Sequence, residues 1–196
     1  MKIKLLSIVT LCLLIAGCQN NKTSRGTDNE KSNGKKILIV YYSHSFGNTR
    51  ALAEQVHHKF GGDLFEIEMV NNYPDNDQEV IAMVKAEMET NPGYRPELKN
   101  KVTGMKDYDV VFIGSPIWFG TAAAPVFTFM DSYDFSGKTI IPFYTCGGGD
   151  EGTFVKDLKE AVPNANFIPG FGNNKSEREN GTHIEKVNQR LDQIVL

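Results

Sequence analysis

Residues 36–60 read KILIVYYSHSFGNTRALAEQVHHKF, and this stretch decides the fold. Its first part, 36–43, is a continuous apolar run rich in β-branched residues, which is typical of a central strand in a parallel sheet. Its last part, 48–60, has the apolar spacing of a helix. The residues on that apolar stripe are Leu52, Val56 and Phe60. The stretch therefore predicts a buried strand, a short turn and an amphipathic helix.

The same alternation continues to the end of the chain. Further strands are predicted at 63–70, 108–117, 138–145 and 165–170. The helices that separate and follow them are predicted at 77–90, 122–133, 152–162 and 182–195. Strands that alternate with helices of this length indicate an α/β fold, a doubly wound parallel sheet of five strands with helices on both faces. We predict one such domain over residues 37–196, with no internal repeat.

The turn SHSFGNT (43–49) has two readings. Hydroxyl side chains, a glycine and a helix start suit a terminal phosphate, because backbone N–H groups and the positive helix end face the ligand. It lacks both G-K-[ST] and G-x-G-x-x-G, so a phosphomonoester fits better than a triphosphate or a dinucleotide. The alternative is an ordinary strand–turn–helix joint, with Asn48 or Thr49 as the N-cap.

Two other joints follow predicted strands and are rich in glycine and hydroxyl groups. They are SPIWFGT (115–121) and TCGGGDEGT (145–153). In a doubly wound sheet, ligands bind beyond the carboxyl ends of the strands, so these joints are expected to meet the turn at 43–49. Trp118 and Phe119 offer flat rings for stacking on a ring system, although a single Trp often belongs to the core. The glycines at 147–149 allow close approach of the backbone to a ligand.

The segments YYSHSFGNTRALAE and IGSPIWFGTAAAPVFTFMDSYDFSGKTIIPFYTCGGG resemble the flavodoxin family, in particular its short bacterial branch with a Trp-aromatic-Gly loop. The similarity covers roughly residues 37–196. It implies strand order 2-1-3-4-5 and bound FMN. The residues expected to bind the cofactor are those of the three joints: Ser43, Ser45, Phe46, Gly47, Asn48, Thr49, Pro116, Ile117, Trp118, Phe119, Gly120, Thr145, Cys146, Gly147, Gly148 and Gly149.

One residue departs from the family pattern. Phe46 lies between Ser45 and Gly47 and makes the phosphate loop one residue longer than T-x-T-G-x-T. The site is still expected at this loop, but the individual hydroxyl–phosphate contacts do not carry over. The chain also lacks the insertion in the fifth strand of long-chain flavodoxins.

The first 17 residues have the pattern of a secretory signal. Two lysines precede a largely apolar run that is too short to span a bilayer. The run ends in LIAGC (14–18), which resembles the lipobox of bacterial lipoproteins. That resemblance implies cleavage before Cys18, a lipidated thiol, and a domain anchored outside the cytoplasm. An ordinary signal peptide with an incidental cysteine is the alternative.

Residues 19–36 contain no aliphatic or aromatic side chain and predict a flexible tether, roughly 25 Å from end to end. Of the 21 Lys and Arg residues, 7 lie in 1–36, as do 2 of the 24 Asp and Glu residues. The domain thus keeps 14 basic and 22 acidic side chains, a net charge of −8. This balance disfavours nucleic acid and suits a basic partner, although an acidic surface is also common without one.

Other chemistry-bearing residues form no recognisable set. Cys146 is the one cysteine of the predicted domain, and without a second thiol a redox role is disfavoured. His57 and His58 are neighbours on a helix and do not share a face, so no metal site is predicted. His44 lies in the phosphate loop and is expected to be solvated. No catalytic residue is predicted.

Three functions compete. The first is an FMN electron carrier that serves a redox partner protein or a small electron acceptor, attached to the membrane only through its lipid. The second is an NAD(P)H-dependent quinone, azo or nitro reductase on the same fold, for which no nicotinamide-binding motif is recognised. The third is a flavodoxin-like domain that no longer binds flavin, which the extra Phe46 keeps open. The carrier is favoured.

Overall fold

The computed structural model describes residues 33–196. The predicted signal peptide, Cys18 and most of the predicted tether lie outside these residues. The strands are β1 (Ile37–Tyr41), β2 (Asp63–Glu66), β3 (Val110–Trp118), β4 (Thr121–Ala122), β5 (Thr139–Cys146), β6 (Asn166–Phe167) and β7 (Phe171–Asn174). The helices are α2 (Asn48–Phe60), α3 (Asp77–Thr90), η1 (Met105–Asp107, a 3₁₀ turn), α4 (Ala124–Asp131), α5 (Phe154–Ala161), α6 (Lys175–Glu179) and α7 (His183–Asp192).

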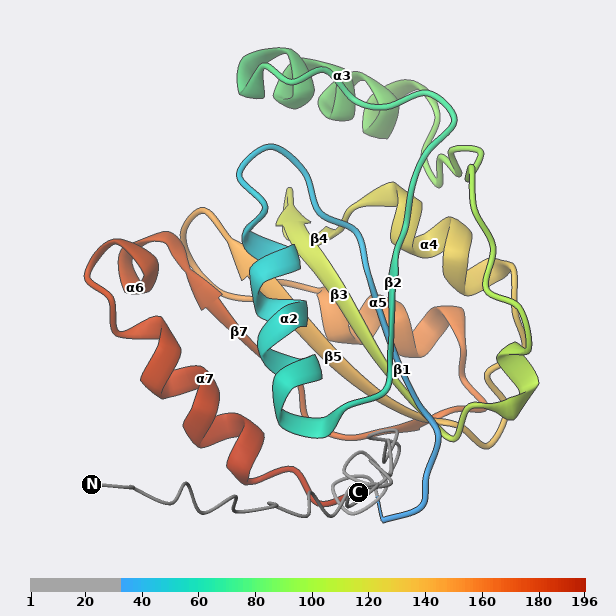
Figure 1. Cartoon of the computed structure of the whole chain (residues 1–196). Helices are drawn as coiled ribbons and strands as arrows, with labels where there is room; N and C mark the ends of the chain where they lie inside the picture. The colour runs from blue at the N-terminus through green and yellow to red at the C-terminus, as the bar shows by residue number, and fades with distance from the viewer. Residues whose placement is uncertain (1–32) are drawn as a thin grey trace, which may run out of the picture.

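The main strands form one parallel sheet in the order β2-β1-β3-β5-β6, and β7 also pairs with β5 in parallel (Figure 1). When β6 and β7 are counted as two parts of one strand, this is the predicted order 2-1-3-4-5. The doubly wound α/β fold expected from the sequence is therefore confirmed. The short β4 adds an antiparallel hairpin to the end of β3, which the sequence analysis did not predict.

The fifth strand differs from its predicted span of 165–170. It consists of β6 and β7, which flank a break at residues 168–170. β6 pairs with Thr139 and Ile140, and pairing resumes with β7 at Phe143. Pro142 lies beside the break and has no amide hydrogen to donate, which accounts for an interruption at this point.

The second strand is also shorter than its predicted span of 63–70. β2 ends at Glu66, after which Ile67 still donates its amide to the Tyr41 carbonyl oxygen, at 2.7 Å. Beyond that point Met69 pairs with Leu98 in an isolated antiparallel bridge. The alternating pattern therefore continues past the strand, but the chain there pairs with a loop.

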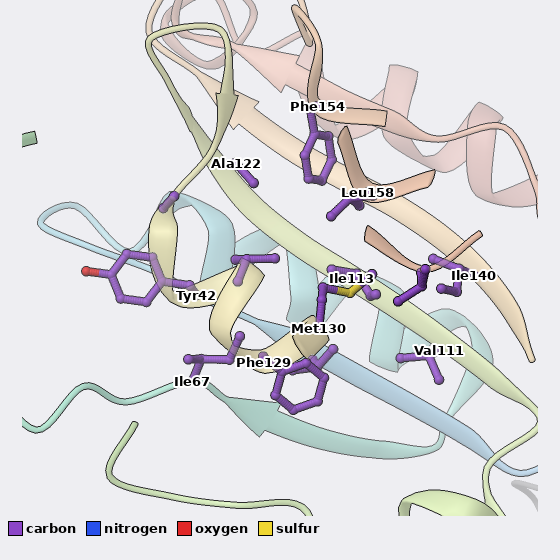
Figure 2. Packing of buried hydrophobic residues seen from close by; sticks show 14 of the residues in the cluster. Tyr42, Ile67, Val111, Ile113, Ala122, Phe129, Met130, Ile140, Phe154 and Leu158 are labelled. Carbon is purple, nitrogen blue, oxygen red and sulfur yellow. The ribbon is translucent and has the colours of Figure 1, made fainter. Parts of the chain in front are cut away.

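Apolar side chains pack on both faces of the sheet. On one face, the apolar stripe of α2 and Val187 and Leu191 of α7 cover the strands. On the other face, Phe129 and Met130 of α4 and Phe154 and Leu158 of α5 pack on Val111, Ile113 and Ile140 (Figure 2). The central strand β1 is buried along its whole length, as its continuous apolar run predicted.

α3 does not lie on either face of the sheet. It crosses the region beyond the carboxyl ends of the strands, away from the other helices (Figure 1). Only Val80 and Val84 of its residues are buried, and both join the cluster on the α4 and α5 side. Its position makes α3 a wall of whatever space lies at the ends of the strands.

One row of residues crosses the whole sheet where the strands approach the site. Glu66, Tyr41, Gly114, Phe143 and Phe171 are neighbours across β2, β1, β3, β5 and β7. A Cβ atom on Gly114 would lie 2.2 Å from Cζ of the Phe143 ring. Gly114 therefore leaves the space in which the fully buried Phe143 packs against Phe171, with ring centroids 6.0 Å apart.

We expect Gly114→Ala to lower the free energy of unfolding by about 1–3 kcal/mol, because the added methyl group forces the Phe143 ring out of its position. Urea denaturation followed by circular dichroism measures the change. Gly148→Ala is the matched control, since a Cβ there meets no atom within 4 Å and the change should stay within about 0.5 kcal/mol. Equal stability of the Gly114→Ala variant and the wild type would contradict this account of the row.

Candidate functional site

The three joints singled out in the sequence meet at one cavity of about 700 Å³. It lies beyond the carboxyl ends of β1, β3 and β5, where the topology of a doubly wound sheet places ligands. Its volume is within the usual range for small-molecule and cofactor sites. The predicted site residues that line it are Ser45, Phe46, Asn48, Thr49, Pro116, Ile117, Trp118, Thr145, Cys146 and Gly147.

The other predicted residues lie beside this cavity. Ser43 and Gly47 line a separate polar cavity of about 370 Å³ on the side of β2, which the Arg50–Glu66 ion pair also lines. The remaining four predicted residues lie in turns next to the cavity but do not line it. They are Phe119, Gly120, Gly148 and Gly149.

The turn after β1 leaves backbone donors at the start of α2. Gly47 has φ 68° and caps the helix without a side-chain hydrogen bond, so neither Asn48 nor Thr49 is the N-cap. The first bond of the helix runs from the Ala51 amide to the Gly47 carbonyl oxygen, at 2.9 Å. The amide groups of Asn48 and Thr49 precede that bond and have no acceptor within the helix, which leaves them for an anion at the positive helix end.

The hydroxyl groups of this turn already have partners in the protein. Ser43 Oγ accepts from the Arg50 amide at 3.2 Å, and Ser45 Oγ donates to Asp77 Oδ1 at 3.0 Å. The Thr49 hydroxyl is buried and shares a hydrogen bond of 2.9 Å with the Thr145 hydroxyl. These bonds hold the loop in shape. They use the Ser45 hydroxyl as a donor, but not the hydroxyl hydrogen of Ser43 nor that of one partner in the Thr49–Thr145 pair, so amides and hydroxyls are both available as donors.

Phe46, the extra residue of the loop, lies at the cavity mouth. Its side chain is 78% exposed, and the preceding Ser45 has φ 45°, an uncommon value for a residue with a side chain. The lengthened loop thus turns outward at Phe46 and still brings Asn48 and Thr49 to the cavity. The extra residue does not close the site.

Trp118 is held by a cluster of aromatic rings. Tyr42, His44 and Tyr73 meet the indole at 86–88°, with centroids 5.1–5.8 Å away. His44 also hydrogen-bonds the Pro74 carbonyl oxygen at 2.9 Å, so it is half-buried rather than solvated as predicted. Edge-to-face contacts of this kind fix the orientation of the indole. Trp118 is therefore a rigid part of the cavity wall.

Phe119 and Gly120 form the two-residue turn of the β3–β4 hairpin. Both have positive φ, 49° and 83°, as in a type I′ turn. The start of α5 braces the turn, because Thr153 donates its amide to the Gly120 carbonyl oxygen at 2.7 Å. Phe119 is 51% exposed and is not one of the residues that line the cavity. Of the two predicted stacking residues, Trp118 alone lines the cavity.

Arg178 of α6 lines the cavity next to the Gly-rich joint, which sequence reasoning missed. Its guanidinium donates to the Asn173 side-chain oxygen at 2.7 Å and to the Cys146 carbonyl oxygen at 3.0 Å, rather than to a carboxylate. A half-buried cation thus stands at the cavity wall. In the sequence, Arg178 follows Asn173 by five residues in NNKSER (173–178). This spacing indicates a cavity residue only once β7 and α6 are known to bring the segment to the cavity.

Cys146 lines the same cavity, and its thiol is not activated as a nucleophile. Burial raises the pKa of its thiol, and the nearby Arg178 charge opposes this rise. The sulfur lies 3.6 Å from the Gly149 carbonyl oxygen and 3.8 Å from that of Asn173. A thiol with a raised pKa contains little thiolate at neutral pH, so this environment does not favour redox chemistry at Cys146.

The described residues offer two further observations. None of their His, Cys, Asp and Glu side chains gather in groups of three or more that would hold a metal ion. None of their helices combines the length and apolarity needed to cross a membrane.

Comparisons with known proteins agree with this arrangement. A family model described as flavodoxin matches residues 36–188. A candidate flavoprotein of Bacteroides eggerthii is 33% identical, with a TM-score of 0.67, and the alignment covers 83% of this chain and 99% of that one. For a candidate flavoprotein of Bacteroides uniformis the values are 31%, 0.65, 78% and 98%.

A flavoprotein of Lactobacillus acidophilus, solved in complex with FMN, is 24% identical with a TM-score of 0.62. The alignment covers 76% of this chain and 99% of that one, and at this identity it speaks for the fold alone. No curated protein matches the chain.

We expect Thr49→Val to lower the free energy of unfolding by about 1–3 kcal/mol, because it leaves the buried Thr145 hydroxyl without its partner. The double variant Thr49→Val/Thr145→Val removes both polar groups and keeps the shape. Its loss of stability should therefore be smaller than the sum of the two single losses. Denaturant titration of the three variants gives the coupling, and strictly additive losses would show that the pair does not bridge β5 and α2.

Proposed function

Because this chain belongs to the flavodoxin family, and because its three strand-end joints meet at one cavity, we propose that it binds FMN and acts as an electron carrier. The convergence of the joints is the observation that carries the proposal. The FMN complex of the Lactobacillus acidophilus flavoprotein is consistent with it. Bound flavin supplies one- and two-electron chemistry, and the protein sets its affinity and potential.

The phosphate end of FMN fits the start of α2. The Asn48 and Thr49 amides lie there without helical acceptors, and the positive helix end favours a dianion. The Ser45 hydroxyl already donates to the Asp77 carboxylate, whose negative charge opposes an anion at that position. We therefore assign the phosphate to the amides of the helix start and not to the Ser45 hydroxyl.

The ring end of FMN fits the space between Trp118 and the joint that begins at Thr145. The indole gives a rigid aromatic wall, and exposed Gly147 allows the backbone to approach a planar ring. Two cationic side chains, Arg178 and Lys175, line this cavity together with two carboxylates, Asp77 and Glu179, so these four charges balance.

The location of the carrier is a proposal from the sequence. LIAGC (14–18) supports lipidation at Cys18 and a place on the outer side of the cytoplasmic membrane. The net charge of −8 in residues 37–196 suits docking to a basic redox partner, and its effect weakens as salt rises. Soluble nicotinamide cofactors are expected to be scarce outside the cytoplasm, which favours the carrier over a reductase.

The absorption spectrum of the purified protein tests the proposal. We expect the absorption bands of an oxidised flavin, on the order of one flavin per chain, with FMN rather than riboflavin released on denaturation. Absence of flavin, together with failure of the protein to bind added FMN, would refute the proposal. Rapid oxidation of NADH or NADPH in the presence of a quinone would instead identify a reductase.

For the cavity wall, we expect Trp118→Leu to weaken FMN binding by about tenfold, because an aromatic contact is worth roughly 0.5–1.5 kcal/mol beyond its buried area. Phe119→Leu is the matched control and should change the Kd less than about twofold, since Phe119 does not line the cavity. Fluorescence titration of FMN, which is quenched on binding, gives both values. A larger loss for Phe119→Leu than for Trp118→Leu would reverse the assignment.

For the anchor, we expect Cys18→Ala to abolish labelling with a radioactive fatty acid and to leave the signal uncleaved. Cys146→Ala is the control and should be labelled like the wild type, because Cys146 is buried in the domain. Persistent labelling of the Cys18→Ala chain would exclude Cys18 as the lipid attachment site.

A further inference from the structure

A second, apolar pocket shares Trp118 with the cavity assigned to FMN. Its volume is about 160 Å³, and it lies under α3, between that helix and the start of α4. Val84 and Met88 of α3 line one side of it. Ala122, Ala123 and Ala124 line another, and Phe127 completes the apolar lining. Because Trp118 lines both spaces, the pocket and the cavity are neighbours across one side chain.

The size of the pocket points to a single ring. An apolar cavity of about 150 Å³ in another protein stays dry and binds benzene. Here the space arises because three consecutive alanines run from the end of β4 into the first turn of α4, where larger side chains would fill it.

The charged groups of the lining favour an uncharged ligand, because they already have partners in the protein. The Arg95 guanidinium donates to the Asp131 carboxylate at 2.6 Å. It also donates to the carbonyl oxygens of Gly93 and Tyr94, and it lies over the Phe127 ring. Glu87 accepts the Tyr73 hydroxyl at 2.8 Å. Both charges are therefore satisfied within the protein, and burial of an ionised ligand beside them would go uncompensated.

We propose that this pocket is a binding site for one uncharged six-membered aromatic ring, held against Trp118. The contacts are apolar, so affinity comes from the area of ring that is removed from water. The site does not require FMN. Its position makes Trp118 the point at which a ring ligand and the occupant of the larger cavity affect each other.

Toluene is the probe, because it is a single uncharged ring. We expect saturable binding to the full chain in isothermal titration calorimetry, with a shift of tryptophan emission to shorter wavelength. Trp118 is the only tryptophan of the chain, so this emission reports the shared wall alone. Benzoate carries the same ring with a negative charge, and it should not bind at the toluene site.

Ala124→Leu places a larger side chain in the pocket and should weaken toluene binding by about tenfold or more. The FMN affinity of this variant should stay within about twofold of wild type, because Ala124 does not line the larger cavity. Met88→Phe is a second filling variant at a half-exposed position, for use if Ala124→Leu fails to fold. Met83→Phe, on the exposed side of α3 and outside the pocket, is the matched control.

No saturable binding of toluene, or unchanged binding in the filling variants, would overturn the proposal. Binding of toluene that Trp118 emission does not report would also overturn it, since the ring would then lie elsewhere. If toluene binds as expected but FMN does not bind, this inference stands and the proposed electron carrier fails.

Discussion

The ring of Phe143 lies where a side chain on Gly114 would be, and the alignment of the central strands depends on this arrangement. The row from Glu66 to Phe171 ties all five strand positions together at one height. Every joint that forms the site leaves the sheet within a few residues of that row. A shift of β5 against β3 would therefore separate the joints that the ligand must touch together.

Beyond this row of residues, the positions of the joints are fixed by contacts between the joints rather than by pairing of the strands. Thr49 and Thr145 link the first and third joints through one buried hydrogen bond. Ser115 accepts the Ala123 amide at 3.0 Å and so closes the base of the hairpin that carries Trp118. The hydroxyl residues that mark these joints in the sequence thus organise the site, while the backbone amides of α2 remain for the ligand. Their role in the fold explains why residue type alone could not distinguish phosphate contacts from internal ones.

The sequence predicted those parts of the structure that depend on periodic burial. The runs at 36–43 and 48–60 gave β1 and α2 closely, and the glycine-rich joints lie together as the parallel topology requires. The parts that depend on contacts between distant residues were missed. Pairing of Met69 with Leu98, the break beside Pro142 and the arrival of Arg178 at the cavity each follow from neighbours more than 25 residues away. Patterns over a short stretch of sequence do not indicate contacts with such distant residues.

The sparse burial of α3 has a consequence for how the cavity is filled. The helix is held by Val80 and Val84, by the Tyr73–Glu87 hydrogen bond and by the Ser45–Asp77 contact at its start. A segment with so few anchors opens at lower free energy than the sheet below it, so its amides exchange with solvent by a local route. Any occupant of the spaces beneath α3 then shifts this opening equilibrium by mass action. The gain in the local stability of α3 when a ligand is added therefore reports the affinity of that ligand.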